Sequence, residues 1–179
     1  SALALAVLAE EAGVPAGVFN VITTKDSRGV GKELTESPLV RKFSFTGSTG
    51  VGKLLYRQCA DTVKKLTLEL GGNAPLIVFD DANLQEAIEG GIANCFNNSG
   101  QSCNSPARML VPFDKMRDAA DIAKRSAEAL KVGDPRDPDT NLGPVVSEQH
   151  FNKIQRLIET GIIEGATLVT GGPGRPEHL

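Results

Sequence analysis

Hydrophobic residues recur at helical spacing in some segments of the chain and at strand spacing in others, and the two kinds of segment alternate. The pattern predicts helices at residues 3–13, 31–36, 50–60, 84–97, 115–130 and 148–164, and strands at 18–23, 40–46, 63–70, 75–79, 107–111 and 167–170. Strands that alternate with helices are typical of a parallel sheet with crossover helices, so the pattern predicts an α/β fold.

The paired glycines Gly71 and Gly72 follow the expected strand 63–70. Glycine allows the backbone to turn sharply. We therefore expect a boundary between a first part, residues 1–70, and a second part, residues 71–179.

Composition excludes several classes of function. The 179 residues, 40% of them hydrophobic, suffice for one domain with a core or for two halves of something larger. The longest apolar runs are far too short to span a bilayer, so no membrane partner is expected. The net charge of -3 shows no excess of basic residues of the kind that binds nucleic acid, so no nucleic-acid partner is expected.

The cysteine pattern points to a reducing compartment. Three cysteines without a CxxC motif argue against a disulfide scaffold, and the two histidines, His150 and His178, argue against zinc, so no metal site is expected. The cytoplasm is the default location and the mitochondrion stays open. Because the chain begins at Ser1 without Met, we expect it to be an internal piece of a longer protein.

A glycine-rich turn, residues 45–53, joins an expected strand to an expected helix. Open α/β sheets bind ligands at such turns, where backbone N–H groups and the helix N-terminus attract an anion and Ser48 could donate to a phosphate. A tight connection that needs glycine only for packing is an equal alternative. Gly47, Gly52 and Lys53 also fit the GxxxxGK pattern of nucleotide hydrolases, but Leu54 stands where that motif needs Ser or Thr to reach magnesium.

Two further residues suggest covalent chemistry. Cys103 follows the polar segment Ser99-Gly100-Gln101, a flexible turn that could expose its sulfur, and Glu69 lies 34 residues upstream at the end of an apolar strand, where a crevice is expected. A thiolate is a nucleophile and a carboxylate can act as general base. The alternatives are a buried structural cysteine and an ordinary charged strand end.

Together these motifs closely resemble the aldehyde dehydrogenase superfamily. The resemblance rests on Phe45-Thr46-Gly47-Ser48, Leu68-Glu69-Leu70-Gly71-Gly72 and Gly100-Gln101-Ser102-Cys103 in this order and spacing, with 14–21 and 142–144 in support. It covers the whole chain, as a central slice of a protein more than twice as long. It implies a Rossmann-like part of an NAD(P)-binding domain at 1–70 and an α/β part of a catalytic domain at 71–179, both incomplete.

The resemblance also implies a reaction, the oxidation of a small-molecule aldehyde to a carboxylic acid with NAD or NADP, in a parent protein that forms a homo-oligomer. Cys103 would attack the aldehyde, and Glu69 would activate the water that releases the acid. The cofactor would be bound by the following residues: Gly47, Ser48, Gly52, Leu70 and Gly71.

The departures from the family pattern concern completeness and substrate. An oxyanion asparagine and a cofactor-binding lysine would precede Ser1, and a ribose-binding acid would follow Leu179, so this chain alone is expected to be inactive. The sequence is most similar to the succinate-semialdehyde branch, yet Asn97 stands where that branch carries an arginine six positions before the cysteine. Two competing hypotheses are the nucleotide hydrolase and a catalytically inactive homologue of the same fold, and the intact Glu69 and Cys103 argue against the inactive homologue.

Overall fold

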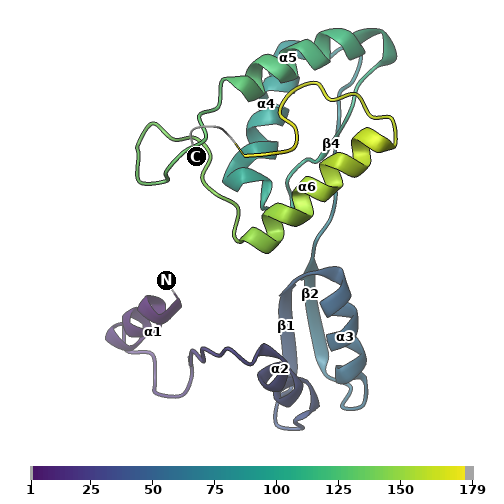
Figure 1. The fold of residues 1–179 in the computed structure, drawn as a ribbon. Coiled ribbons are helices and arrows are strands. Elements are labelled where there is room, and N and C mark those ends of the chain that lie inside the picture. The colour runs from purple at the N-terminus through teal and green to yellow at the C-terminus, as the bar shows by residue number, and fades with distance from the viewer. Residues whose placement is uncertain (1, 176–179) are drawn as a thin grey trace. The chain divides into compact units, whose positions relative to one another are not determined.

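The computed structural model describes residues 2–175 (Figure 1). The chain divides into two compact units, Ser1–Leu70 and Gly71–Leu179. Gly71 and Gly72 are not among the described residues with positive φ, so the chain passes this boundary without the left-handed backbone that only glycine adopts freely. The cofactor and catalytic roles of the two units stay predictions.

The first unit is built around a parallel strand pair. Its elements are α1 (Ala2–Glu11), α2 (Ser27–Glu36), β1 (Lys42–Gly47), α3 (Thr49–Ala60) and β2 (Lys65–Leu70). Strands β1 and β2 pair in parallel from Lys42 opposite Lys65 to Gly47 opposite Leu70, and α3 is the crossover between them. The buried residues of α3 are Gly52, Leu55 and Cys59, a stripe at helical spacing.

Helix α2 begins four residues before the predicted start at residue 31. The cause is a helix cap: the carboxylate of Asp26 accepts a hydrogen bond from the Gly29 N–H at 2.8 Å. Near its other end, Thr35 is fully buried and donates to the carbonyl of Gly31 at 2.9 Å. Thr35 also lies 3.2 Å from Oε1 of Gln58, which ties α2 to α3.

Two predicted strands, 18–23 and 167–170, are wrong, because the structure forms neither. Val18 and Ile22 are 70% and 75% exposed. A strand requires a hydrogen-bonded partner as well as suitable side chains, and neither segment finds one among the described residues.

The second unit repeats the strand–helix pattern. Its elements are β3 (Pro75–Ile77), α4 (Leu84–Phe96), a 3₁₀ turn (Asn97–Gly100), β4 (Arg108–Leu110), a second 3₁₀ turn (Phe113–Lys115), α5 (Met116–Glu128) and α6 (Glu148–Ile163). Strands β3 and β4 pair in parallel and are shorter than predicted. The core consists of buried residues from the position just after β3 and from helices α4 and α5: Val78, Ile88, Ala119 and Ile122. Parallel strand pairs joined by helices confirm the α/β class.

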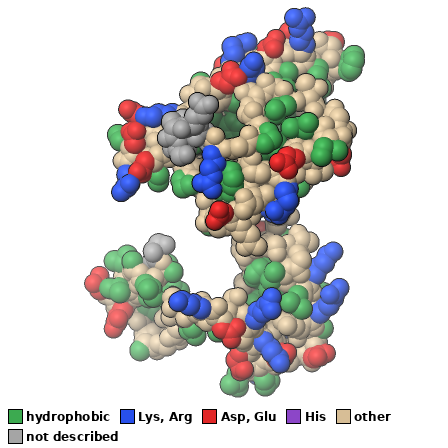
Figure 2. Space-filling model, in the orientation of Figure 1, with side chains coloured by type: hydrophobic (Ala, Val, Ile, Leu, Met, Phe, Trp, Pro, Cys, Tyr) green, Lys and Arg blue, Asp and Glu red, His purple; other side chains and the backbone are tan. Residues whose placement is uncertain are grey.

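The surface carries many apolar side chains. Every large hydrophobic residue of α1 is more than half exposed: Leu3, Leu5, Val7 and Leu8. Acidic and basic side chains are interspersed over the visible face (Figure 2). Among residues 2–175, no helix is long and apolar enough to cross a membrane.

Candidate functional site

The glycine-rich turn forms the N-terminus of α3. Ser48 is the cap residue, and its hydroxyl accepts from the Val51 N–H at 3.4 Å, while its carbonyl accepts from the Gly52 N–H at 2.9 Å. A hydroxyl that accepts one hydrogen bond keeps its own hydrogen to donate. The N–H groups of Thr49 and Gly50 precede the first bond of the helix ladder, so they can meet a ligand.

The glycines of this turn allow close packing. A Cβ at Gly52 would lie 2.6 Å from Cδ2 of Leu70, so the absence of a side chain lets α3 lie directly against the end of β2. A Cβ at Gly47 would lie 2.4 Å from the ring of Phe45. Beside Gly50, a Cβ would meet nothing within 4 Å. Packing therefore explains Gly47 and Gly52, and the backbone at Gly50 is open.

The same geometry argues against a nucleotide hydrolase. Ser48 alone separates β1 from α3, so Gly52 and Lys53 lie inside the helix. The hydrolase motif needs the residues between its first glycine and its lysine as a loop that wraps around phosphates. In this chain that loop is replaced by the first turn of α3, and the exposed Leu54 offers magnesium no ligand.

Glu69 is the penultimate residue of β2, paired with Thr46 of β1. Its side chain is exposed, so the described residues of the first unit do not by themselves form the crevice predicted around it. Leu70, the next residue, pairs with Gly47 and packs against Gly52. The first unit thus brings together four of the predicted cofactor-binding residues at the carboxyl end of its strand pair: Gly47, Ser48, Gly52 and Leu70.

The three cysteines occupy different environments. Cys59 is buried, Cys95 is half-buried and Cys103 is exposed. Burial raises the pKa of the Cys59 thiol, an effect that the nearby Lys64 partly opposes. Since the thiolate is the reactive form, burial protects the Cys59 thiol, whereas Cys103 is an exposed residue.

Cys103 lies in a tight turn in which the Ser105 N–H donates to the Ser102 carbonyl at 3.1 Å. One end of this turn is fixed by Ser105, a buried residue whose hydroxyl donates to the Cys95 carbonyl at 2.7 Å. The Cys103 carbonyl lies 4.0 Å from the position that a Cβ of Gly72 would take. The second unit therefore brings Gly72 beside the thiol-bearing turn, whereas a Cβ at Gly71 would meet nothing within 4 Å.

The segment before Cys103 is held in place rather than loose, which corrects the prediction of a flexible turn. The hydroxyl of Ser99 donates to the Gly143 carbonyl at 2.9 Å, and Oε1 of Gln101 accepts from the Val146 N–H at 2.8 Å. Sequence reasoning did not foresee these contacts, because the partners lie 44 and 45 residues away. Glu69 belongs to the first unit and Cys103 to the second, so their pairing is part of the proposal below.

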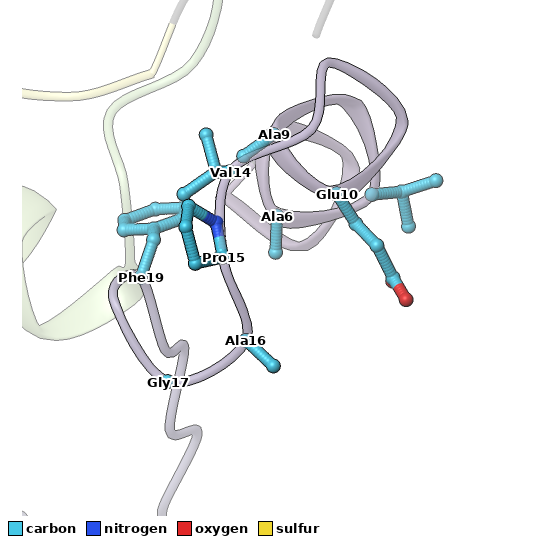
Figure 3. Close-up of a pocket in the computed structure, with 9 residues that line it drawn as sticks. Ala6, Ala9, Glu10, Val14, Pro15, Ala16, Gly17 and Phe19 are labelled. Atoms are coloured by element: carbon cyan, nitrogen blue, oxygen red, sulfur yellow. The ribbon is translucent and has the colours of Figure 1, made fainter.

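A hollow of about 400 Å³ lies elsewhere in the first unit, between α1 and the segment that follows it (Figure 3). Val14, Pro15 and Phe19 line one side, and Ala6, Ala9 and Glu10 of α1 line another. None of the predicted site residues lines it. Among residues 2–175 no three His, Cys, Asp or Glu side chains gather to hold a metal ion, and His178 lies outside these residues.

The sequence model of the aldehyde dehydrogenase family matches residues 1–178. A 3-succinoylsemialdehyde-pyridine dehydrogenase of Pseudomonas sp is 45% identical over all of this chain and 37% of its own length. The NADP(+) succinate-semialdehyde dehydrogenase GabD of Escherichia coli is 48% identical over 96% of this chain and 36% of its own. The chain thus spans little more than a third of these relatives.

Solved structures of aldehyde dehydrogenases also match the fold of this chain. Aldehyde dehydrogenase C of Pseudomonas syringae, solved as a cysteine-to-alanine variant with NAD+ and octanal, superimposes with a TM-score of 0.94 at 40% identity, over 98% of this chain and 36% of that one. An NADP-dependent enzyme of E. coli gives a TM-score of 0.93 at 47% identity, over 97% and 36% of the two chains. Because the family model matches residues 1–178 of 179, the chain belongs to the aldehyde dehydrogenase family.

Proposed function

We propose that the full-length protein oxidises an aldehyde to a carboxylic acid with NAD or NADP, through a covalent intermediate on Cys103. One observation carries the proposal. Of the three cysteines, only Cys103 is an exposed residue, on a turn fixed by side-chain hydrogen bonds, and it stands at the position that the family motif reserves for the nucleophile.

The chemistry follows from the groups present. The Cys103 thiolate attacks the aldehyde carbonyl carbon and forms a C–S bond, and the backbone N–H of Cys103 helps to stabilise the oxyanion. Loss of hydride from this adduct leaves a thioester on the sulfur. Glu69 then takes a proton from water, whose oxygen attacks the thioester carbon, and the C–S bond breaks to release the acid and the thiolate. The covalent route divides one difficult oxidation into two easier steps.

The N-terminus of α3 fits a dinucleotide. The hydroxyl of Ser48 and the N–H groups of Thr49 and Gly50 supply donors for a pyrophosphate, and the open space beside Gly50 lets it approach. Gly47 and Gly52 allow the close packing behind the site, and Leu70 with Gly71 would lie near the nicotinamide. When bound, the nicotinamide would supply the acceptor for the hydride that the Cys103 adduct loses. Either dinucleotide is a candidate, because GabD is named for NADP(+) and aldehyde dehydrogenase C was solved with NAD+.

The substrate is an aldehyde, with succinate semialdehyde the first compound to test because GabD is named for it. Asn97, an exposed residue at the end of α4, stands where that branch carries arginine. A neutral amide does not form the paired hydrogen bonds that a guanidinium makes to a carboxylate. A panel of succinate semialdehyde against neutral aldehydes of equal length decides the preference. Homo-oligomeric assembly and a cytoplasmic location complete the proposal.

The test uses the full-length protein. We expect NADH or NADPH to appear on addition of aldehyde, and the Cys103→Ser variant to form none. Labelling with iodoacetamide, read by mass spectrometry, should modify Cys103 faster than Cys59 and Cys95. Equal labelling of the three thiols would remove the nucleophile role of Cys103. Labelling of Cys103 without aldehyde turnover would favour the inactive homologue.

A further inference from the structure

The backbone just before the thiol-bearing turn is strained. Three consecutive residues, Asn98, Ser99 and Gly100, have φ of 53°, 56° and 75°. Left-handed backbone is unfavourable for residues that carry a Cβ, and two such residues in succession are rare. Strain of this kind persists only where surrounding contacts impose it, and it gathers at functional sites.

Two side chains bond this segment to residues much farther along the chain. Gln101 makes contacts in both directions, because its Oε1 accepts from the Val146 N–H at 2.8 Å and its Nε2 donates to the Asn98 carbonyl at 3.0 Å. Ser99 donates to the Gly143 carbonyl at 2.9 Å. Both side chains thus connect the strained segment to residues 143–146, which we call the support segment.

The support segment is attached to a loop that is itself hydrogen-bonded. The Gly133 N–H donates to the Leu142 carbonyl at 3.0 Å, and the Leu142 N–H donates to the Lys131 carbonyl at 3.0 Å. A Cβ at Gly143 would lie 3.6 Å from Cβ of Pro135, so this residue packs against the same loop. The contacts of Ser99 and Gln101 therefore lead to an ordered structure.

We propose that Ser99 and Gln101 are positioning residues for Cys103, which hold its turn in the geometry for attack by bonding to the support segment. This inference rests on the proposed function for its effect on catalysis. It assigns no contact with substrate to either residue. A small displacement of a nucleophile is costly to the rate even where the fold survives.

The test compares three variants of the full-length protein with substitutions at two glutamines, Gln101 and Gln155. Gln101→Met removes both bonds of Gln101 and keeps a side chain of similar length. Gln155→Met is the matched control, because Gln155 of α6 is also half-buried and its Oε1 accepts from the Gly174 N–H at 2.6 Å. Gln101→Glu is the conservative variant, because its carboxylate keeps the acceptor for the Val146 N–H.

Two measurements are made on each variant: amide hydrogen exchange of residues 97–105 and 143–147, and steady-state kinetics. For Gln101→Met we expect faster exchange in both segments and a fall in kcat/KM for the aldehyde of about tenfold, with the KM for the cofactor unchanged. Gln101→Glu should restore part of both. Gln155→Met should change neither.

Other results would overturn the inference. If Gln101→Met loosens both segments but kcat/KM stays within about twofold of wild type, the contacts are only structural. If exchange does not change, Gln101 does not hold the segment. If the wild-type protein turns over no aldehyde, the proposed function fails, and exchange in residues 97–105 then decides by itself whether the support segment fixes the turn.

Discussion

Replacement of Ser105 by alanine tests how firmly the thiol-bearing turn is held. Cys95 lies in the last turn of α4, where carbonyl groups have no partner within the helix. The Ser105 hydroxyl meets the Cys95 carbonyl at 2.7 Å, and Ser105 is 8% exposed. Loss of this bond leaves a poorly hydrated acceptor unsatisfied, which costs about 1–3 kcal/mol.

We take about 1.4 kcal/mol as the working value, which corresponds to a tenfold change in an equilibrium constant. The opening of residues 94–105 should therefore become about tenfold more favourable in Ser105→Ala. Amide hydrogen exchange of the native full-length protein measures this opening directly. The substitution adds no atoms, so no clash contributes to the result.

Ser126→Ala is the control for this prediction. The Ser126 hydroxyl donates to the Ile122 carbonyl at 2.9 Å, but this carbonyl also accepts from the backbone N–H one helical turn later. Its hydroxyl is therefore dispensable, and we expect less than about 0.5 kcal/mol of change. Equal exchange at residues 94–105 in the two variants would refute the claim that Ser105 anchors the turn.

Three further predictions address chemistry, specificity and stability. In the Glu69→Gln variant the aldehyde should still acylate Cys103, so one equivalent of reduced cofactor forms in a rapid burst and steady turnover stops. A steady rate equal to that of wild type would exclude Glu69 as the base. Asn97→Arg should raise kcat/KM for succinate semialdehyde about tenfold relative to butanal, because a guanidinium pairs with the substrate carboxylate; an unchanged ratio in the substrate panel would contradict this. Burial raises the pKa of the Cys59 thiol, so at alkaline pH the folded protein keeps the thiol proton that the unfolded chain loses. The stability that Cys59 contributes is therefore fully present below the ordinary thiol pKa of about 8.5 and is lost as the pH rises through the higher folded pKa. Denaturation midpoints between pH 7 and 9.5 should decline less in Cys59→Ala than in wild type, and parallel declines would disprove the contribution of this thiol.

Several local features could be read from the sequence because their causes are local. Helix α3 follows from the helical spacing of its buried residues, Gly52, Leu55 and Cys59, and its start follows from the cap at Ser48. The start of α2 was also readable, since Asp26 is a cap residue, but the prediction began the helix too late. The α/β class followed from the alternation of strand and helix patterns.

Features that depend on distant partners could not be read in this way. Residues 18–23 have the composition of a strand, but strand formation needs a partner that no local pattern specifies. Likewise, Ser99 and Gln101 look like ordinary turn residues in the sequence, so the turn was predicted to be flexible.

The sequence by itself determined the motifs and most of the helices and strands, and it led to the proposal of Cys103 as the nucleophile, because these depend on residue type and spacing. Only the tertiary structure decided that this cysteine is exposed while Cys59 is buried, and that Ser99 and Gln101 bind residues 44 and 45 positions away. The physical reason is that burial and long-range hydrogen bonds depend on which surfaces meet after the chain folds. Neither hydrophobic periodicity nor motif spacing contains that information.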